Sequence, residues 1–379
     1  GNNMVNGKGY QMATQSGGTI KFQGDAISTN QTIAITNNNP NDTGNNGLSG
    51  SRWNVLANPF PSYINANSNA GTNNFLSVNS SLFHASWSAI YGFDGNGGHV
   101  VINNSSSATY LAPGQGFFMA SVAAGGTVNY NTNMRTIGGG DDFITGRLAN
   151  TSKEFYLSLY EGDNSVDYNK FYFDNGLTLG LDSGYDAGAF DQNMSISSRL
   201  VEEDEGINFI FNAMGLSALD EETVIPLVLN RDAGVEFSIS FEDSTIPEDV
   251  GVYLEDTLLE TLTDLRSEDF TLTPESDLSD MGRFYLRIGN TSLGGNDLDE
   301  SYISIYKAAS DDFVTIEGLS NVEKANVQLF NIIGQEVLNK TLNSNQSTQR
   351  VSTSGLTTGV YVIRLQADSS VIAKKIIIN

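Results

Sequence analysis

Residues 355–378 read GLTTGVYVIRLQADSSVIAKKIII, and this stretch decides the fold of the C-terminal part of the chain. β-Branched and aromatic residues fill 359–367 and 371–378, which favours two strands. The Ala-Asp-Ser-Ser segment between them favours a hairpin turn. An apolar strand at a chain end must be paired, because an open apolar edge promotes aggregation. The stretch therefore predicts a paired terminal β-hairpin.

Five more strands are expected before this hairpin. They are short apolar runs separated by turn residues, at 303–307, 313–317, 325–331, 336–341 and 349–351. Seven strands in residues 301–379 are typical of a compact Greek-key sandwich similar to an immunoglobulin domain.

The rest of the chain also has the period-two pattern of strands, as in EFYLSLY at 154–160. Helical periodicity is weak, and residues 213–222 predict about one helical turn. We therefore expect an all-β fold of tandem β-sandwich domains.

Charge divides the chain into three blocks. The net charge of −25 is confined to residues 141–300, which carry −27, whereas the blocks on either side carry +1 each. This predicts an Asn/Gly-rich β domain at 1–140, an acidic β-sandwich or jelly-roll-like domain at 141–295 and a terminal domain at 301–379.

Composition excludes several classes of function. Without cysteine, the chain has no disulfide, thiol nucleophile or cysteine-based zinc site. A pI near 4.2 argues against nucleic acid as a partner. No apolar run reaches the roughly 18 residues of a membrane-spanning helix. The chain starts at Gly1 without a signal-peptide pattern, so we expect the mature or C-terminal portion of a longer protein.

Residues 301–379 resemble the type A C-terminal sorting domain of the Bacteroidetes type IX secretion system. The similarity rests on VQLFNIIGQ at 327–335, GLTTGVYVIR at 355–364 and KKIIIN at 374–379. The Asn-Pro pair that often precedes the family's first strand is missing from SIYKAAS at 304–310.

This resemblance implies a secreted or cell-surface protein exported through the periplasm and outer membrane. The implied partners are the outer-membrane translocon, a β-barrel shuttle protein and a sortase-like peptidase, with possible attachment to surface lipopolysaccharide. Cleavage is expected in the linker at about 294–301. The residues expected to carry the signal are Gly334, Gln335, Gly355, Leu356, Gly359, Val360, Tyr361, Lys374, Lys375, Ile376, Ile377 and Ile378. We expect the two lysines to pair with acidic groups on a receptor.

Two upstream landmarks resemble the stalk region that often precedes such sorting domains. WNVLANPFPS at 53–62 is similar to its GWNLIGNPYPS segment, and QGFF at 115–118 is similar to its GQGFFV segment. Looser similarities lie at 147–148, 185–187 and 283–286. The upstream domains are therefore expected to act as a stalk or adhesin-like module.

No catalytic constellation emerges from the sequence. His84 and His99 lack metal-ligand spacing, and no Gly-x-Ser-x-Gly elbow accompanies the serines near them. We therefore expect no enzyme activity, no metal and no cofactor.

The alternative is a carbohydrate- or calcium-binding module of a larger secreted polysaccharide-degrading enzyme. Calcium-loop fragments at 94–98 and 297–300 and six aromatic residues suggest it, although alternating aromatics more often form a core. The six are Trp53, Trp87, Tyr91, Phe93, Phe117 and Phe118. Ser244 and Thr257 fit a short O-glycosylation motif of Bacteroidetes proteins.

Overall fold

The structure is a computed structural model that describes most of the chain. The described residues are 4–10, 24–38, 52–93, 99–137, 153–190, 194–259, 261–279, 281–289, 303–307, 311–319, 324–331, 335–342, 346, 348–367 and 370–378. Contacts group the chain into two compact units. The first comprises Gly1–Asp42, Leu48–Thr151 and Ser183–Phe190, and the second comprises Thr43–Gly47, Ser152–Asp182 and Asp191–Asn379.

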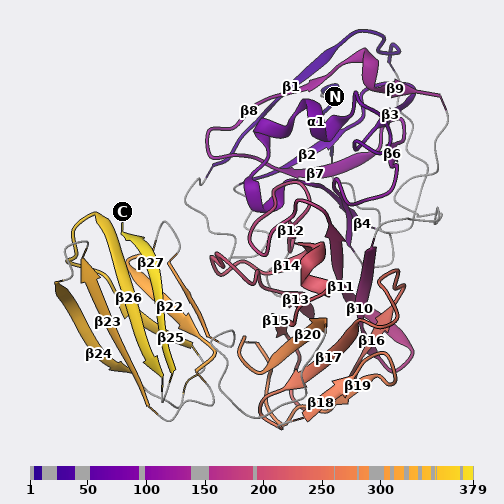
Figure 1. Ribbon diagram of the computed structural model, residues 1–379. Helices are drawn as coiled ribbons and strands as arrows, with labels where there is room; N and C mark the ends of the chain where they lie inside the picture. The colour runs from indigo at the N-terminus through magenta and orange to yellow at the C-terminus, as the bar shows by residue number, and fades with distance from the viewer. Residues whose placement is uncertain are drawn as a thin grey trace. The chain divides into compact units, whose positions relative to one another are not determined.

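The first unit combines short strands with single helical turns (Figure 1). Its strands form a four-stranded sheet ordered β2-β7-β4-β5, a pair β1-β8 and a small sheet β6-β3-β9. A cluster of buried apolar side chains, including Leu56, Phe75 and Phe117, forms its core. The elements are β1 (Gln31–Ile35), β2 (Trp53–Ala57), β3 (Tyr63–Asn65), α1 (Phe75–Val78), η1 (Ser80–Leu82), η2 (Ala85–Trp87), β4 (Ile90–Phe93), β5 (His99–Ile102), β6 (Tyr110–Leu111), β7 (Gly116–Ala120), β8 (Gly126–Tyr130), η3 (Thr132–Met134), β9 (Arg135–Thr136) and β12 (Ala187–Gly188).

The acidic part of the second unit is one continuous sheet that curls around its own core. Its strand order is β18-β17-β20-β15-β13-β14-β11-β10-β16-β19, and β11 and β14 pair in parallel. Phe270 of β19 lies 5.9 Å from Phe284 of β20 between ring centroids, so strands far apart in this order face each other. The elements are β10 (Lys153–Glu161), β11 (Asn164–Asp174), β13 (Ile196–Ser198), β14 (Phe209–Gly215), η4 (Leu216–Leu219), β15 (Thr223–Leu229), β16 (Phe237–Glu242), β17 (Gly251–Asp256), β18 (Thr261–Asp264), β19 (Phe270–Leu272) and β20 (Phe284–Gly289).

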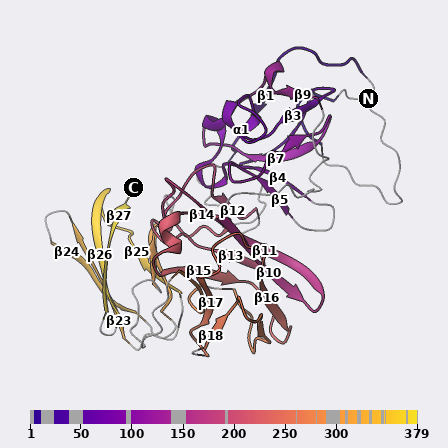
Figure 2. The ribbon, with the colours of Figure 1, turned by 45° about the vertical axis from the view of Figure 1, so that its right-hand side comes forward.

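The C-terminal part of the second unit is a two-layer sandwich (Figures 1 and 2). One layer is β21-β22-β25 and the other is β24-β23-β26-β27, with all neighbours antiparallel. Val314, Val327 and Ile363 lie in the core between the layers. The strands are β21 (Ser304–Tyr306), β22 (Phe313–Glu317), β23 (Ala325–Asn331), β24 (Glu336–Leu342), β25 (Thr348–Ser352), β26 (Gly359–Ala367) and β27 (Ser370–Ile378).

The all-β prediction is confirmed, and so is a terminal sandwich of seven strands. Three C-terminal strands, at 313–317, 325–331 and 359–367, have the predicted bounds. The helical turn expected within 213–222 is the 3-10 helix η4. It is short, because the first three residues of that range belong to β14, which ends at Gly215. The three-domain division remains a prediction. Within the described residues, no helix is long and apolar enough to cross a membrane.

Candidate functional site

The terminal hairpin carries most of the residues predicted to act as a signal. Strands β26 and β27 pair over nine residues, from Gly359 opposite Ile378 to Ala367 opposite Ser370. β27 ends the order of its sheet, so only β26 pairs with it within the described part of the chain (Figure 1). The hairpin is thus both a structural strand pair and an open sheet edge.

One side of this hairpin is apolar and exposed. Val360, Val362 and Ile377 are 40%, 41% and 56% exposed. The register sets Val360 opposite Ile377, and Val362 opposite the exposed Lys375. We call these four residues the outer hairpin face. An exposed apolar group with a basic residue beside a free sheet edge is suited to contact with another protein.

The opposite side of the hairpin faces the core. Tyr361, Ile376 and Ile378 are buried there, and the Tyr361 hydroxyl donates to the Thr357 carbonyl at 2.8 Å. Their side chains stabilise the sandwich and reach no external surface. A role for these three residues in partner binding remains a prediction.

Lys374 differs from its neighbour Lys375. It lies on the inward side of β27 and is half-buried. Burial lowers the pKa of Lys374, while the carboxylates of Asp204, Glu203 and Glu205 act in the opposite direction. These carboxylates belong to the connection between β13 and β14 in the same chain. The carboxylates that act on the pKa of Lys374 therefore belong to the same chain and not to a receptor.

The predicted turn residues that the structure describes lie between strands or at a strand end. The Gln335 backbone N–H, just before β24, donates to the side-chain oxygen of Asn331 at the end of β23, at 3.0 Å. Gly355 has a φ of +90°, which favours glycine, and Leu356 packs against the core. Gly359 starts β26. Gly334 lies outside the described residues.

The two upstream landmarks form one structural feature. Strands β2 and β7 pair antiparallel, from Trp53 opposite Ala120 to Ala57 opposite Gly116. The buried Asn58 side chain donates to the carbonyls of Ser62, Leu111 and Ala112 at 2.8–3.1 Å and accepts the Phe60 N–H at 3.0 Å. Asn58 therefore holds the proline-containing corner against the segment that enters β7.

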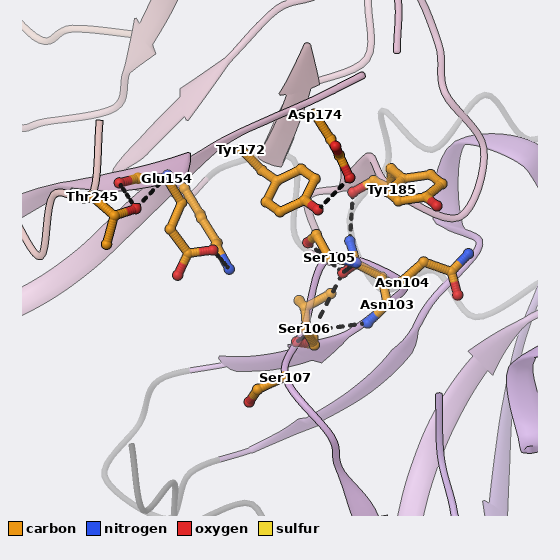
Figure 3. A network of polar contacts seen from close by, with 12 residues as sticks. Asn103, Asn104, Ser105, Ser106, Ser107, Glu154, Tyr172, Asp174, Tyr185 and Thr245 are labelled. Atoms are coloured by element: carbon orange, nitrogen blue, oxygen red, sulfur yellow. Dashed lines mark hydrogen bonds and ion pairs between the residues drawn. The ribbon is translucent and has the colours of Figure 1, made fainter. Parts of the chain in front are cut away.

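A second asparagine ties the 183–190 segment to the first unit (Figure 3). The Asn103 side chain donates to the Tyr185 carbonyl, and its oxygen accepts the N–H and hydroxyl of Ser105 at 3.0 and 2.6 Å. Trp87 and Tyr91 then donate to the carbonyls of Ala189 and Gly188 at 3.0 and 2.9 Å.

Phe190, at the end of that segment, covers an aromatic side of the β2-β7-β4-β5 sheet. Its ring lies 4.5 Å from Trp53 and 5.2 Å from Phe118 between centroids. Of the six aromatics considered as a carbohydrate platform, Trp87, Tyr91 and Phe117 are buried, Trp53 and Phe118 are half-buried, and Phe93 is 47% exposed. The carbohydrate hypothesis therefore retains one well-exposed ring.

His84 serves a structural role. Its Nδ1 accepts the Ser86 N–H at 3.4 Å at the start of η2. Burial, aided by the charge of Arg52, lowers the His84 pKa to about 4, so its imidazole is neutral at pH 7.

Metal-ligating groups do not gather in the described residues, where no cluster of three or more His, Asp or Glu side chains could hold a metal ion. The two calcium-loop fragments, 94–98 and 297–300, lie outside the described residues.

The two glycosylation candidates differ in access. Ser244 is exposed in the connection after β16, next to Thr245, whose N–H donates to the Glu154 carbonyl at 2.8 Å (Figure 3). The Thr257 hydroxyl is half-buried and donates to the Arg283 carbonyl at 3.0 Å. Geometry favours Ser244 as an acceptor, and modification of either residue remains a prediction.

Comparison with known proteins adds two family matches. Residues 1–288 match the model described as "Domain of unknown function (DUF8693)". Residues 304–379 match the model described as "Secretion system C-terminal sorting domain", which confirms the resemblance seen in the sequence. No curated protein matches the chain.

Two solved structures show remote likeness. A two-fibronectin type-III domain segment from chicken tenascin is 11% identical, with a TM-score of 0.18, covering 42% of this chain and 98% of that one. A biofilm associated protein, BSP domain, is 8% identical, with a TM-score of 0.20, covering 97% of this chain and 99% of that one. At these TM-scores neither likeness bears on function.

Proposed function

The chain belongs to the family described as a domain of unknown function (DUF8693), and its last part is a type IX secretion C-terminal sorting domain. From these two matches we propose a function for each part. The sorting domain makes the chain a cargo that is exported through the outer membrane to the cell surface or released. We propose that the outer hairpin face is what the export machinery contacts, and that residues 1–288 form the exported stalk or adhesin-like module.

The observation that carries the proposal is the exposure of Val360, Val362 and Ile377 beside the edge of β27, which pairs only with β26 among the described strands. A folded domain gains nothing in stability from apolar side chains left in water. Contact with a partner would bury them and could extend the sheet at the same edge. The translocon and the β-barrel shuttle protein are the proposed partners.

Further processing belongs to the same proposal. A sortase-like peptidase would remove the sorting domain in the linker at about 294–301, which lies outside the described residues. The exported part would then be released or attached to surface lipopolysaccharide.

The proposed module is non-enzymatic. His84 supports this, because its lowered pKa and its hydrogen bond at the start of η2 leave it poorly placed as a general base at neutral pH. Screening the purified chain for hydrolysis of polysaccharides tests this point, and turnover of any substrate would refute it.

Export of the full chain from a type IX-competent bacterium tests the proposed face. Val360→Thr and Ile377→Thr keep β-branched side chains while making the outer hairpin face polar. Both should shift the protein from the surface to the periplasm, measured by protease treatment of intact cells. Val235→Thr, at a site 36% exposed in the acidic part, is the matched control and should export normally. Normal export of both hairpin variants would refute the proposed face.

A further inference from the structure

Arg199 lies at the centre of a buried polar cluster that joins two distant stretches of the second unit. Its Nε donates to the Asn208 side-chain oxygen at 2.7 Å, and its Nη1 lies 3.3 Å from the Asp204 carboxylate. Its Nη2 donates to the Glu317 carboxylate at 3.2 Å. Arg199 and Asp204 precede β14, whereas Glu317 ends β22 of the terminal sandwich. The guanidinium therefore bridges carboxylates from both stretches.

Two more side chains of the sandwich complete the contact. The Ser304 hydroxyl donates to Asp204 Oδ2 at 2.6 Å, and the Tyr306 hydroxyl donates to Glu317 Oε1 at 3.0 Å. The Tyr306 ring also lies under the guanidinium, 5.5 Å from the Arg199 Cζ to the ring centroid. Charge-assisted hydrogen bonds are stronger than neutral ones, and removing one partner of a buried ion pair leaves an uncompensated charge.

Glycine is required where the tyrosine ring meets the loop. Gly206 has a φ of +81°, and a Cβ at this position would collide with the Tyr306 ring. Its N–H donates to Asp204 Oδ1 at 2.9 Å, which holds the carboxylate in place for Arg199. The 199–206 loop is thus shaped to receive this ring.

The two lysines of the terminal strand lie on opposite sides of it. Lys374 is half-buried on the inward side, and the carboxylates of Asp204, Glu203 and Glu205 oppose the lowering of its pKa by burial. Lys375 is exposed on the opposite side of the strand. The exposed residue is therefore the one available to an outside partner.

We propose that Ser304, Tyr306 and Glu317 form an inner docking face whose partner is the 199–206 loop of the same chain, leaving the outer hairpin face to the export machinery. The second half of this statement rests on the proposed function. Tyr306 and Glu317 then anchor the sorting domain on its own cargo, whereas Lys375 is presented outward on β27.

Two variants of the full chain separate the two roles. Because the chain has no cysteine, cysteines introduced at the exposed Thr261 and Thr341 can carry spin labels whose separation reports docking. The labelled chain without further change should give one narrow distance distribution. Tyr306→Ala removes the ring that meets the 199–206 loop, so it should give a broad distribution and leave export unchanged. Lys375→Glu should keep the narrow distribution and reduce export.

Each outcome bears on one claim. A narrow distribution in Tyr306→Ala would overturn the docking face, whatever happens to export. Normal export of Lys375→Glu would count against the outer face alone. Gly206→Ala provides a second, charge-neutral way to undock, because its methyl group meets the Tyr306 ring. Gly234→Ala is its control, with a φ of +77° and open space around the added Cβ, and it should remain docked.

Discussion

Truncating two adjacent isoleucines of β27 should have very different effects on stability. Ile376 is 5% exposed and packs in the sandwich core, whereas Ile377 is 56% exposed on the outer hairpin face. Ile→Ala removes three carbon atoms. At about 0.8 kcal/mol per buried CH₂ plus a cavity term, Ile376→Ala should cost about 3 kcal/mol. In Ile377→Ala, less than half of the surface of the removed atoms was buried, so the substitution should cost about 1 kcal/mol or less.

Amide hydrogen exchange in peptides from 359–378 is the suitable assay, because it reports local stability within a chain of several parts. A loss of about 3 kcal/mol corresponds to a roughly 160-fold faster exchange of the most protected amides in Ile376→Ala. Ile377→Ala should change it less than about sixfold. Equal acceleration in both variants would refute the assignment of the two sides of the strand.

Three further predictions concern the first unit, whose unfolding the two tryptophans, Trp53 and Trp87, report by fluorescence. Asn58→Ala removes a buried donor to the Ser62, Leu111 and Ala112 carbonyls and the acceptor of the Phe60 N–H, and should lower the free energy of unfolding by about 2 kcal/mol. Gly188→Ala places a methyl group against the indole of Trp87 and should cost about 2 kcal/mol. Folding lowers the pKa of His84 from 6.5 to about 4, so as pH falls through 6.5 the unfolded chain binds a proton that the folded chain does not. The contribution of neutral His84 to the free energy of unfolding should therefore be fully present above pH 6.5 and be lost, by about 3 kcal/mol, as the pH falls toward 4. His84→Asn should remove this part of the pH dependence.

Controls for these predictions come from the same unit. Gly24→Ala should be neutral, because open space surrounds the added Cβ. Destabilisation by Gly24→Ala equal to that by Gly188→Ala would contradict the packing of the 183–190 segment. An unchanged unfolding midpoint in Asn58→Ala would contradict its role in the corner. An identical pH profile in His84→Asn would contradict the titration argument.

Local pattern was sufficient to predict most of the terminal sandwich. The β-branched and aromatic residues within 359–367, bounded by turn residues on both sides, were enough to predict β26 from end to end. The short strands β13 (ISS) and β18 (TLTD) were missed, because polar residues within them hide the period of two. Their strand conformation comes from pairing with neighbours rather than from local preference.

The orientation of β27 shows where sequence reasoning stops. A period of two puts Lys374 with Ile376 and Ile378, and Lys375 with Ile377. Since both sides carry isoleucine, the pattern alone does not say which side is buried. The register with β26 settles it, because the buried Ile363 lies opposite Lys374.

The Arg199 cluster could not be predicted from the sequence pattern either. Arg199 and Glu317 are 118 positions apart, and Arg199 follows a short strand that the pattern did not reveal. Within the acidic run at 202–205, only Asp204 is buried. A run of acidic residues in a connection predicts a solvated surface, and only the fold selects the one carboxylate that faces inward.

The central claim is that the terminal domain by itself directs export. The most direct measurement is the surface exposure of a fluorescent protein fused to residues 301–379, which have their own core of buried apolar side chains. Expressed in a type IX-competent bacterium, the fusion should be removed by protease added to intact cells. A fusion that is folded and fluorescent but stays protected in the periplasm would contradict the account.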